Sequence, residues 1–279
     1  GEGAWDTAPY YHWAVSGGTA GAPITPATDP AGARCLTLRG AALEDLTGQT
    51  GTLRLVTRSG PNPAPQLDLN AVVVGNTTLS QVDLDAALAK TSAIWTSGGG
   101  PSVGSAVAYS LPGDTYLAYD DSTALRASSI DASRTRAMNL FFVQDYASPD
   151  GTLGEAGGIP GPIGLQGVDE AGVILAVDAH LKFDGTVDTD LLGGTIAHEV
   201  GHQLGLFHTT ESDGTRIESL DDTPDCPSNA DVDDDGYWSA EECQGFDGPN
   251  FMFWSAGSFV QETVSADQGW LLGRAPVAY

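Results

Sequence analysis

Basic residues are scarce in this sequence of 279 residues. It contains 11 lysines and arginines against 37 aspartates and glutamates, for a formal net charge of −26, and its only lysines are Lys90 and Lys182. Phosphate backbones and anionic lipid surfaces repel so acidic a protein, so we expect no nucleic acid partner. The sequence also lacks any apolar run near the roughly 20 residues of a transmembrane helix. We therefore expect no membrane insertion, and we expect a monomer.

Cysteine is equally rare, with only Cys35, Cys226 and Cys243. Cys226 and Cys243 bracket an acidic segment and are candidates for a disulfide, which is typical of an oxidising compartment. Cys35 would then be either buried and free or bonded to a part of the precursor outside this sequence. The sequence opens at Gly1 rather than Met. We therefore expect a secreted, extracellular protein from which a signal peptide, and a propeptide with it, has been removed.

The first 64 residues are rich in turn-forming residues and contain short β-like runs. These runs lie at 10–15, 34–38 and 52–57. Because Gly-rich turns separate them, we expect residues 1–64 to form a β-rich N-terminal segment or small domain. The segment SGPNPAPQ at 59–66 is the best candidate for a linker to a second domain, residues 65–279.

Residues 65–279 show the patterns of an α/β domain. We expect strands at 67–75, 105–111, 138–146 and 172–180. We expect helices at 81–95, from near Asp188 or Asp190 to Gly205, and at 265–272. The last two strands are nearly all apolar, as in central strands covered on both faces. The pattern predicts an α/β (α+β) fold with a mixed twisted sheet, an upper lobe over about 65–205 and a loop-rich lower lobe over about 206–279.

Residues 198–208, HEVGHQLGLFH, contain three of the five histidines of the chain. His198 and His202 are four residues apart, so they lie on one face of a helix and can bind one metal ion. Gly205 permits the left-handed conformation that ends a helix, after which His208 can return as a third nitrogen ligand. Three neutral imidazoles leave a fourth position open for water, which is the arrangement of a catalytic Zn²⁺ site.

Glu199 lies between the two helical histidines and can reach a water molecule at such an ion. Zinc lowers the pKa of that water to about 7 in known cases. As general base, Glu199 would accept the proton and then deliver it to the leaving amine. The motif therefore predicts a zinc-dependent endopeptidase that acts on a protein or peptide substrate.

Together with its flanking residues, this motif resembles the metzincin metallopeptidases, and among them the pappalysin family. The residues that carry the resemblance are HEVGHQLGLFHTT at 198–210, DDTPDC at 221–226 and NFM at 250–252. The resemblance implies a metzincin-like catalytic domain in a secreted, calcium-dependent endopeptidase. It also implies zinc ligands at His198, His202 and His208, with Met252 in a tight turn beneath the metal.

The sequence departs from the family pattern at two places after Met252. Trp254 stands where many relatives have a tyrosine whose hydroxyl assists the tetrahedral intermediate. Residues 253–259, FWSAGSF, contain no acid, although relatives selective for basic residues often have one there. The resemblance also places the edge strand that pairs with an extended substrate at residues 157–164, GGIPGPIG. The Gly and Pro content of this segment favours a loop or a broken strand instead.

Residues 231–242, DVDDDGYWSAEE, fit the calcium-loop pattern D-x-D-x-D-G-x5-E. The expected oxygen ligands are the side chains of Asp231, Asp233, Asp235, Ser239 and Glu242 and the backbone carbonyl of Tyr237. Gly236 permits the sharp turn that the loop needs. Flanking helices are not evident, and a Cys226–Cys243 disulfide would close the loop instead. We therefore expect a structural Ca²⁺ ion here.

Two other functions remain open on the sequence. The acidic loop and the β-rich N-terminal segment are compatible with a calcium-stabilised binding or adhesion module that carries an inactive protease fold. Glu199 argues against this alternative, because a binding module does not need the base. The same zinc motif would also serve an amidase that acts on cell-wall peptides.

Overall fold

The computed structural model describes residues 63–75, 77–111, 134, 136–145, 151–162, 167, 170–275 and 277–279. All of them belong to one compact unit, Val56–Tyr279. The strands expected at 10–15, 34–38 and 52–57, and Cys35, lie outside the described residues, and the domain boundary at residue 64 stays a prediction. No helix in the described part of the chain is long and apolar enough to cross a membrane.

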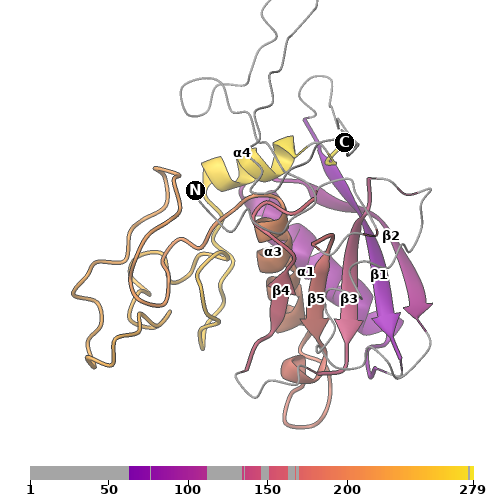
Figure 1. The fold of residues 1–279 in the computed structure, drawn as a ribbon, viewed down its shortest axis with the longest axis horizontal. Helices are drawn as coiled ribbons and strands as arrows, with labels where there is room; N and C mark the ends of the chain where they lie inside the picture. The colour runs from indigo at the N-terminus through magenta and orange to yellow at the C-terminus, as the bar shows by residue number, and fades with distance from the viewer. Residues whose placement is uncertain are drawn as a thin grey trace, which may run out of the picture. The chain divides into compact units, whose positions relative to one another are not determined.

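Among the described residues, five strands form one mixed sheet (Figure 1). The strands are β1 (Gln66–Val74), β2 (Ser102–Leu111), β3 (Met138–Val143), β4 (Gly154–Ala156) and β5 (Val173–Ala176). Their order in the sheet is β2-β1-β3-β5-β4. All neighbours pair in parallel except β4, which is antiparallel to β5 at the edge. The predicted α/β class with a mixed sheet is confirmed.

The central strands β3 and β5 are buried along their whole length. Because successive side chains point to opposite faces, Leu140 and Phe142 belong to the core between the sheet and the helices, while Phe141 and Ile174 belong to a second apolar cluster. The strand expected at 172–180 ends earlier, at Ala176. The chain turns there into the short 3-10 helix η3 (Asp178–His180), and His180 Nδ1 lies 2.6 Å from Ala176 O.

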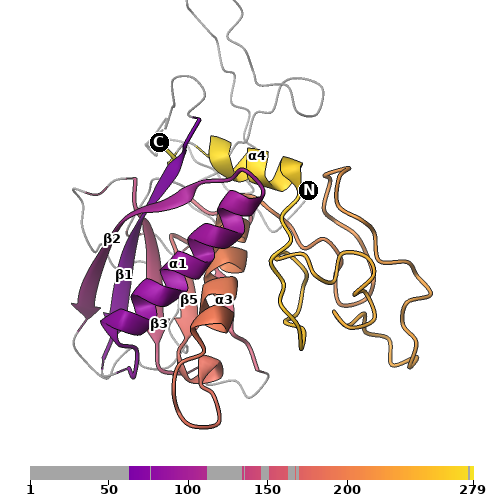
Figure 2. The same ribbon diagram turned by 180° about the vertical axis from the view of Figure 1, so that it is seen from behind.

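Two helices cover one face of the sheet, α1 (Gln81–Ser97) and α3 (Thr189–Gln203), and they lie side by side (Figure 2). A capping box between Ser80 and Asp83 begins α1. The side chain of Asp188 begins α3 by accepting a hydrogen bond from Leu191 N at 3.2 Å. Both starts agree with the sequence prediction.

Glycine allows α3 to approach α1 closely. A Cβ atom at Gly193 would lie 2.6 Å from the backbone oxygen of Ala87, so no larger residue fits without moving a helix. Across this contact, Thr91 Oγ1 donates to Gly193 O at 2.9 Å and Trp95 Nε1 donates to Ala197 O at 3.3 Å. The helix that carries the histidine motif is therefore held rigidly against α1 and the sheet.

Beyond α3 the chain runs through loops until α4 (Ala266–Arg274). These loops lie to one side of α3 in both ribbon views (Figures 1 and 2). A capping box between Ser265 and Gln268 begins α4. The helix predicted at 265–272 and the loop-rich character after residue 206 agree with this arrangement.

Candidate metal centre

The three histidines of the motif gather their ring nitrogens at the end of α3. One ligand nitrogen from each of His198, His202 and His208 lies within 4.8 Å of the others. The ring centroids of His198 and His202 are 4.6 Å apart, and His208 lies 4.6 Å from His202 and 5.2 Å from His198. His208 reaches the cluster because Gly205, with φ of 106°, reverses the chain just after the helix.

Hydrogen bonds at Nδ1 fix the orientation of all three rings. Nδ1 lies 2.8 Å from Phe251 O in His198, 2.8 Å from Leu206 O in His202, and 2.9 Å from Glu211 Oε2 in His208. Carbonyl and carboxylate oxygens only accept hydrogen bonds, so Nδ1 is the donor in each neutral ring and Nε2 keeps its lone pair.

The Nε2 atoms of His202 and His208 are only 3.0 Å apart. Two lone pairs at this distance repel each other unless a cation lies between them. Three converging imidazole nitrogens with fixed tautomers are the donor set that Zn²⁺ takes in a catalytic site. The residues present therefore fit a zinc ion.

The electrostatic surroundings keep the rings of His198 and His202 neutral. Burial, together with the neighbouring His208, lowers the pKa of His202 to about 4. Burial lowers the pKa of His198 well below its ordinary value, with added effects from His202 and His208. Only neutral imidazole can bind a metal, so both shifts favour metal binding near neutral pH.

Glu199 lies on α3 beside the edge strand β4 and is 8 % exposed. Its pKa is raised to about 8, chiefly by burial and to a smaller extent by the charge of Glu155, although the backbone N–H of Ala156 donates to its carboxylate and opposes the shift. A Cβ atom at Gly154 would lie 2.8 Å from Glu199 Cγ, so glycine is needed for this close approach. The result is a buried carboxyl group with a high proton affinity next to the histidines.

Met252 forms the floor beneath α3 and is fully buried. A Cβ atom at Gly201 would lie 2.6 Å from Met252 Sδ. The Oδ1 atom of Asn250 accepts a hydrogen bond from Met252 N at 2.8 Å, and Met252 O accepts one from Thr209 N at 3.0 Å. This turn therefore contacts both the helix that carries two histidines and the segment that carries the third.

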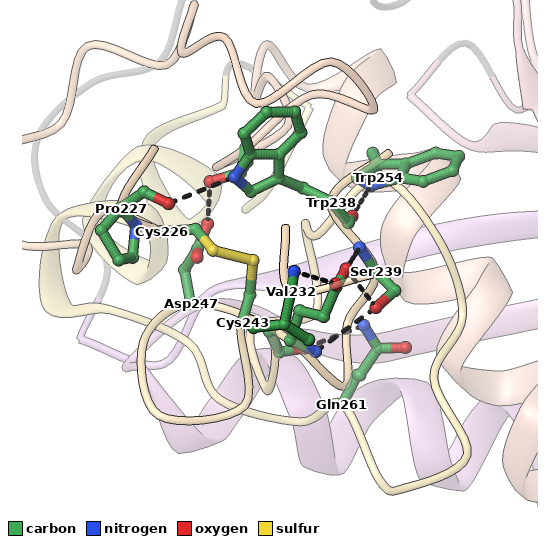
Figure 3. Close-up of a disulfide and its surroundings, with 12 residues drawn as sticks. Cys226, Pro227, Val232, Trp238, Ser239, Cys243, Asp247, Trp254 and Gln261 are labelled. Atoms are coloured by element: carbon green, nitrogen blue, oxygen red, sulfur yellow. Dashed lines mark hydrogen bonds between the residues drawn. A yellow bond between two sulfur atoms is a disulfide. The ribbon is translucent and has the colours of Figure 1, made fainter. Parts of the chain in front are cut away.

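The only side-chain hydrogen-bond donor of Trp254, its indole N–H, is engaged by Trp238. Its Nε1 donates to Trp238 O at 2.5 Å, and its ring packs against the apolar cluster around the disulfide (Figure 3). This indole N–H is therefore not available to stabilise an oxyanion.

Residues 157–164, GGIPGPIG, were expected to form the edge strand of the sheet, but the described residues of this segment do not form a strand. The edge strand is β4, the three residues directly before that segment, and residues 157–162 follow it as irregular chain. Pro160 and Pro162 have no N–H for a ladder, and Gly161 N donates instead to Gln203 O at 3.0 Å. The segment therefore packs against the end of α3. Residues 163–164 lie outside the described part of the chain.

The acidic loop brings three carboxylates together. Oxygen atoms of Asp231, Asp233 and Asp235 lie within 4.8 Å of one another. Asp231 accepts hydrogen bonds from Asp235 N at 3.2 Å and Gly236 N at 3.0 Å, and Gly236 has φ of 83°. The loop is thus closed around its first carboxylate, and no helix flanks it.

The far end of this loop folds back onto its start. Glu242 accepts hydrogen bonds from Val232 N at 2.8 Å and from Ser239 Oγ at 2.7 Å, and the Ser239 and Val232 donors lower its pKa. Tyr237 N donates to Asp235 Oδ1 at 2.8 Å. The next residue, Cys243, forms a disulfide with Cys226, with Cα atoms 5.4 Å apart (Figure 3). The predicted disulfide is confirmed.

No protein-family model matches the chain, and no curated protein matches it. Among solved structures, it is similar to mature mirolysin from Tannerella forsythia in complex with a cleaved peptide, with 17 % identity over 76 % of this chain and 91 % of that chain, and a TM-score of 0.49. It is also similar to metalloproteinase-II from Bacteroides fragilis, with 11 % identity over 78 % of this chain and 55 % of that chain, and a TM-score of 0.43. Archaemetzincin from Methanopyrus kandleri shares 14 % identity over 53 % of this chain and 78 % of its own, with a TM-score of 0.33.

Proposed function

We propose that this protein is a zinc-dependent endopeptidase, with His198, His202 and His208 as zinc ligands and Glu199 as the general base. The observation that carries the proposal is the convergence of three histidine rings whose Nδ1 atoms are all engaged, so that their Nε2 lone pairs point into one small space. A buried carboxyl group with a raised pKa stands beside them.

A zinc ion held by these residues would supply Lewis acidity, which acidifies water and polarises a peptide carbonyl. The residues of the chain supply proton transfer and positioning. Glu199 takes a proton from the attacking water and delivers it to the leaving amine. The N–H of Ala156 holds its carboxylate at the edge of β4, and the packing of α3 against α1 keeps Glu199 in register with the histidines.

The substrate class follows from the edge of the sheet. Strand β4 pairs with β5 on one side, and no described strand pairs with its other side. An edge strand can offer backbone donors and acceptors to an extended peptide. Because Glu199 lies at that edge, we propose that a protein or peptide binds along β4 with a peptide bond next to the base.

We further propose that the chain is a pappalysin-like metzincin and that it is secreted. The motif at 198–208, the DDTPDC segment and the position of Met252 beneath α3 support the first proposal. The Cys226–Cys243 disulfide supports the second, because disulfides persist in oxidising compartments.

We also propose a structural Ca²⁺ ion in the loop 231–242. Its support is the pairing of a calcium-loop sequence pattern with three carboxylates whose oxygens lie within 4.8 Å. Asp231, Asp233 and Asp235 would supply side-chain ligands. Glu242, Ser239 and the carbonyl of Tyr237 would complete the set from the end of the loop.

The experiment that tests the function compares the wild type with Glu199→Gln on two substrates, an unfolded protein and a cell-wall peptide. Glu241→Gln is the matched control, because Glu241 is exposed and its carboxylate accepts a hydrogen bond from Ser258 N at 2.6 Å, outside the histidine cluster. We expect the wild type and the control to cleave the protein, and Glu199→Gln to keep zinc and lose cleavage. Cleavage of the cell-wall peptide alone would establish the amidase. A binding module would be established if the wild type cleaves neither substrate, and if Glu199→Gln leaves every measured behaviour unchanged while removal of Ca²⁺ destroys it.

A further inference from the structure

We infer that Glu211 is a positioning residue for the third zinc ligand, holding the ring of His208 and placing a negative charge behind it. This inference rests on the proposed function. It begins from an asymmetry among the three histidines. The Nδ1 atoms of His198 and His202 meet neutral backbone carbonyls, whereas Nδ1 of His208 meets the carboxylate of Glu211 at 2.9 Å.

His208 is the ligand that most needs such a partner. His198 and His202 are carried by α3, which is packed against α1 and the sheet. His208 lies in a loop, and its side chain is 24 % exposed. The contact from Thr209 N to Met252 O holds the backbone just after it, but the orientation of the ring depends on Glu211.

Glu211 is itself presented by a well-defined turn. Glu211 N donates to Thr215 O at 2.8 Å, and Gly214 N donates to Glu211 O at 2.9 Å. The carboxylate of Asp213 accepts from Thr215 N at 3.0 Å and from Thr215 Oγ1 at 2.6 Å, and this lowers its pKa. These bonds close residues 211–215 on themselves, so the backbone of Glu211 is fixed before any metal binds.

Trp238 packs against this turn. A Cβ atom at Gly214 would lie 2.6 Å from the Trp238 ring, and Trp238 N donates to Ser212 O at 3.0 Å. The indole N–H of Trp238 donates in turn to Pro227 O at 3.2 Å, next to the disulfide (Figure 3). The turn that carries Glu211 is thus connected through Trp238 to Pro227, the residue after Cys226 of the disulfide.

The chemical effect of this contact is specific. A hydrogen bond to an ionised acceptor is stronger than one to a neutral carbonyl. It keeps the hydrogen on Nδ1 and makes Nε2 a better donor to a metal ion. Carboxylate partners behind metal-bound histidines typically change metal affinity by about 10–100-fold when they are removed. Glu211 should therefore raise the zinc affinity of the site by a factor in this range.

The test measures zinc dissociation constants by competition with a chromophoric chelator in Glu211→Ala, Glu211→Gln and the control Glu241→Gln. We expect Glu211→Ala to bind zinc about 10–100-fold more weakly than the wild type. Glu211→Gln keeps an acceptor oxygen but loses the charge, so its affinity should lie between the two. The control loses one equal charge in the same lobe and should bind like the wild type.

A second readout separates positioning from a loss of folding. The ¹⁵N chemical shifts of the His208 ring in the metal-free protein report which nitrogen carries the hydrogen. We expect Nδ1–H in the wild type and in Glu211→Gln, and a mixture of both forms in Glu211→Ala at an unchanged melting temperature. Equal zinc affinity in Glu211→Ala and the control would overturn the inference while leaving the zinc site intact. A wild type that binds no zinc would instead overturn the proposed function.

Discussion

Two glycines of α3 provide a matched test of how the floor of the site is built. A Cβ atom at Gly201 would lie 2.6 Å from Met252 Sδ and 3.3 Å from Phe251 Cε2, whereas a Cβ atom at Gly194 would meet nothing within 4 Å. Both residues lie inside the same helix, so replacement by alanine gives each the same propensity gain of about 0.5–1 kcal/mol. The difference between Gly201→Ala and Gly194→Ala therefore isolates the contact with the Met252 turn.

Overpacking a buried contact costs about 1–3 kcal/mol. For a chain of this size each kcal/mol shifts the melting temperature by about 2–4 °C, so Gly201→Ala should melt roughly 2–12 °C below Gly194→Ala. Gly194→Ala should be slightly more stable than the wild type. Thermal unfolding of the metal-free proteins, followed by circular dichroism, measures both shifts.

The Gly201→Ala substitution should also weaken zinc binding at the histidines. The turn that Gly201→Ala displaces carries Phe251 O, the partner of His198, and Met252 O, which holds the segment after His208. We expect weaker zinc binding in Gly201→Ala and unchanged zinc binding in Gly194→Ala. Equal melting temperatures and equal zinc affinities in the two variants would refute the role assigned to Met252.

Three further predictions concern stability. Replacing Cys226 and Cys243 by alanine opens a loop with a sequence separation of 17, which should cost about 3 kcal/mol in urea unfolding; an unchanged midpoint would contradict this. Removing Ca²⁺ should lower the melting temperature and expose residues 221–247 to limited proteolysis, whereas an unchanged melting temperature would exclude a structural ion. Burial lowers the pKa of His180 in the folded protein, so the unfolded chain takes up a proton at this residue more readily than the folded protein. The buried neutral ring therefore contributes fully to the free energy of unfolding above the unfolded pKa of about 6.5, and this contribution is lost as the pH falls below that value. In chelator-treated protein, the unfolding free energy of His180→Gln should fall less steeply between pH 7 and 5 than that of the wild type. The same slope in both proteins would argue against this role of His180.

Local patterns predicted the elements whose sequence carries a strong signal. The apolar periodicity after Ser80 placed α1, and the nearly continuous apolar residues of β3 and β5 placed the central strands. Strand β4 was missed because Gly154–Ala156 has only three residues and no alternation, so its pairing with β5 defines it. The Pro-containing segment after it was expected to be the edge strand, but its prolines cannot join a ladder.

In the site, too, features set by nearby residues could be predicted from the sequence, whereas features set by contacts between distant segments could not. The spacing of His198, His202 and His208 predicted their convergence, because helix geometry and a glycine turn suffice to bring them together. The contact of Glu211 with His208 could not be predicted, since it depends on how the turn packs against Trp238. The Asp-Gly pair at 213–214 was a signal for that turn. The engaged indole of Trp254 likewise depends on a partner 16 residues away.

The most direct test of the zinc endopeptidase is the rate of peptide cleavage before metal removal, after it, and after zinc is returned. The measurement uses a diverse peptide library, so that activity and cleavage-site preference are read together. The proposed mechanism requires that activity disappears when zinc is removed and returns with one equivalent of zinc. It also requires that Glu199→Gln, loaded with zinc, cleaves at least about 100-fold more slowly than the wild type, because general acid–base catalysis contributes about 10²–10⁴-fold. Full activity in the verified metal-free protein, or in Glu199→Gln, would contradict it.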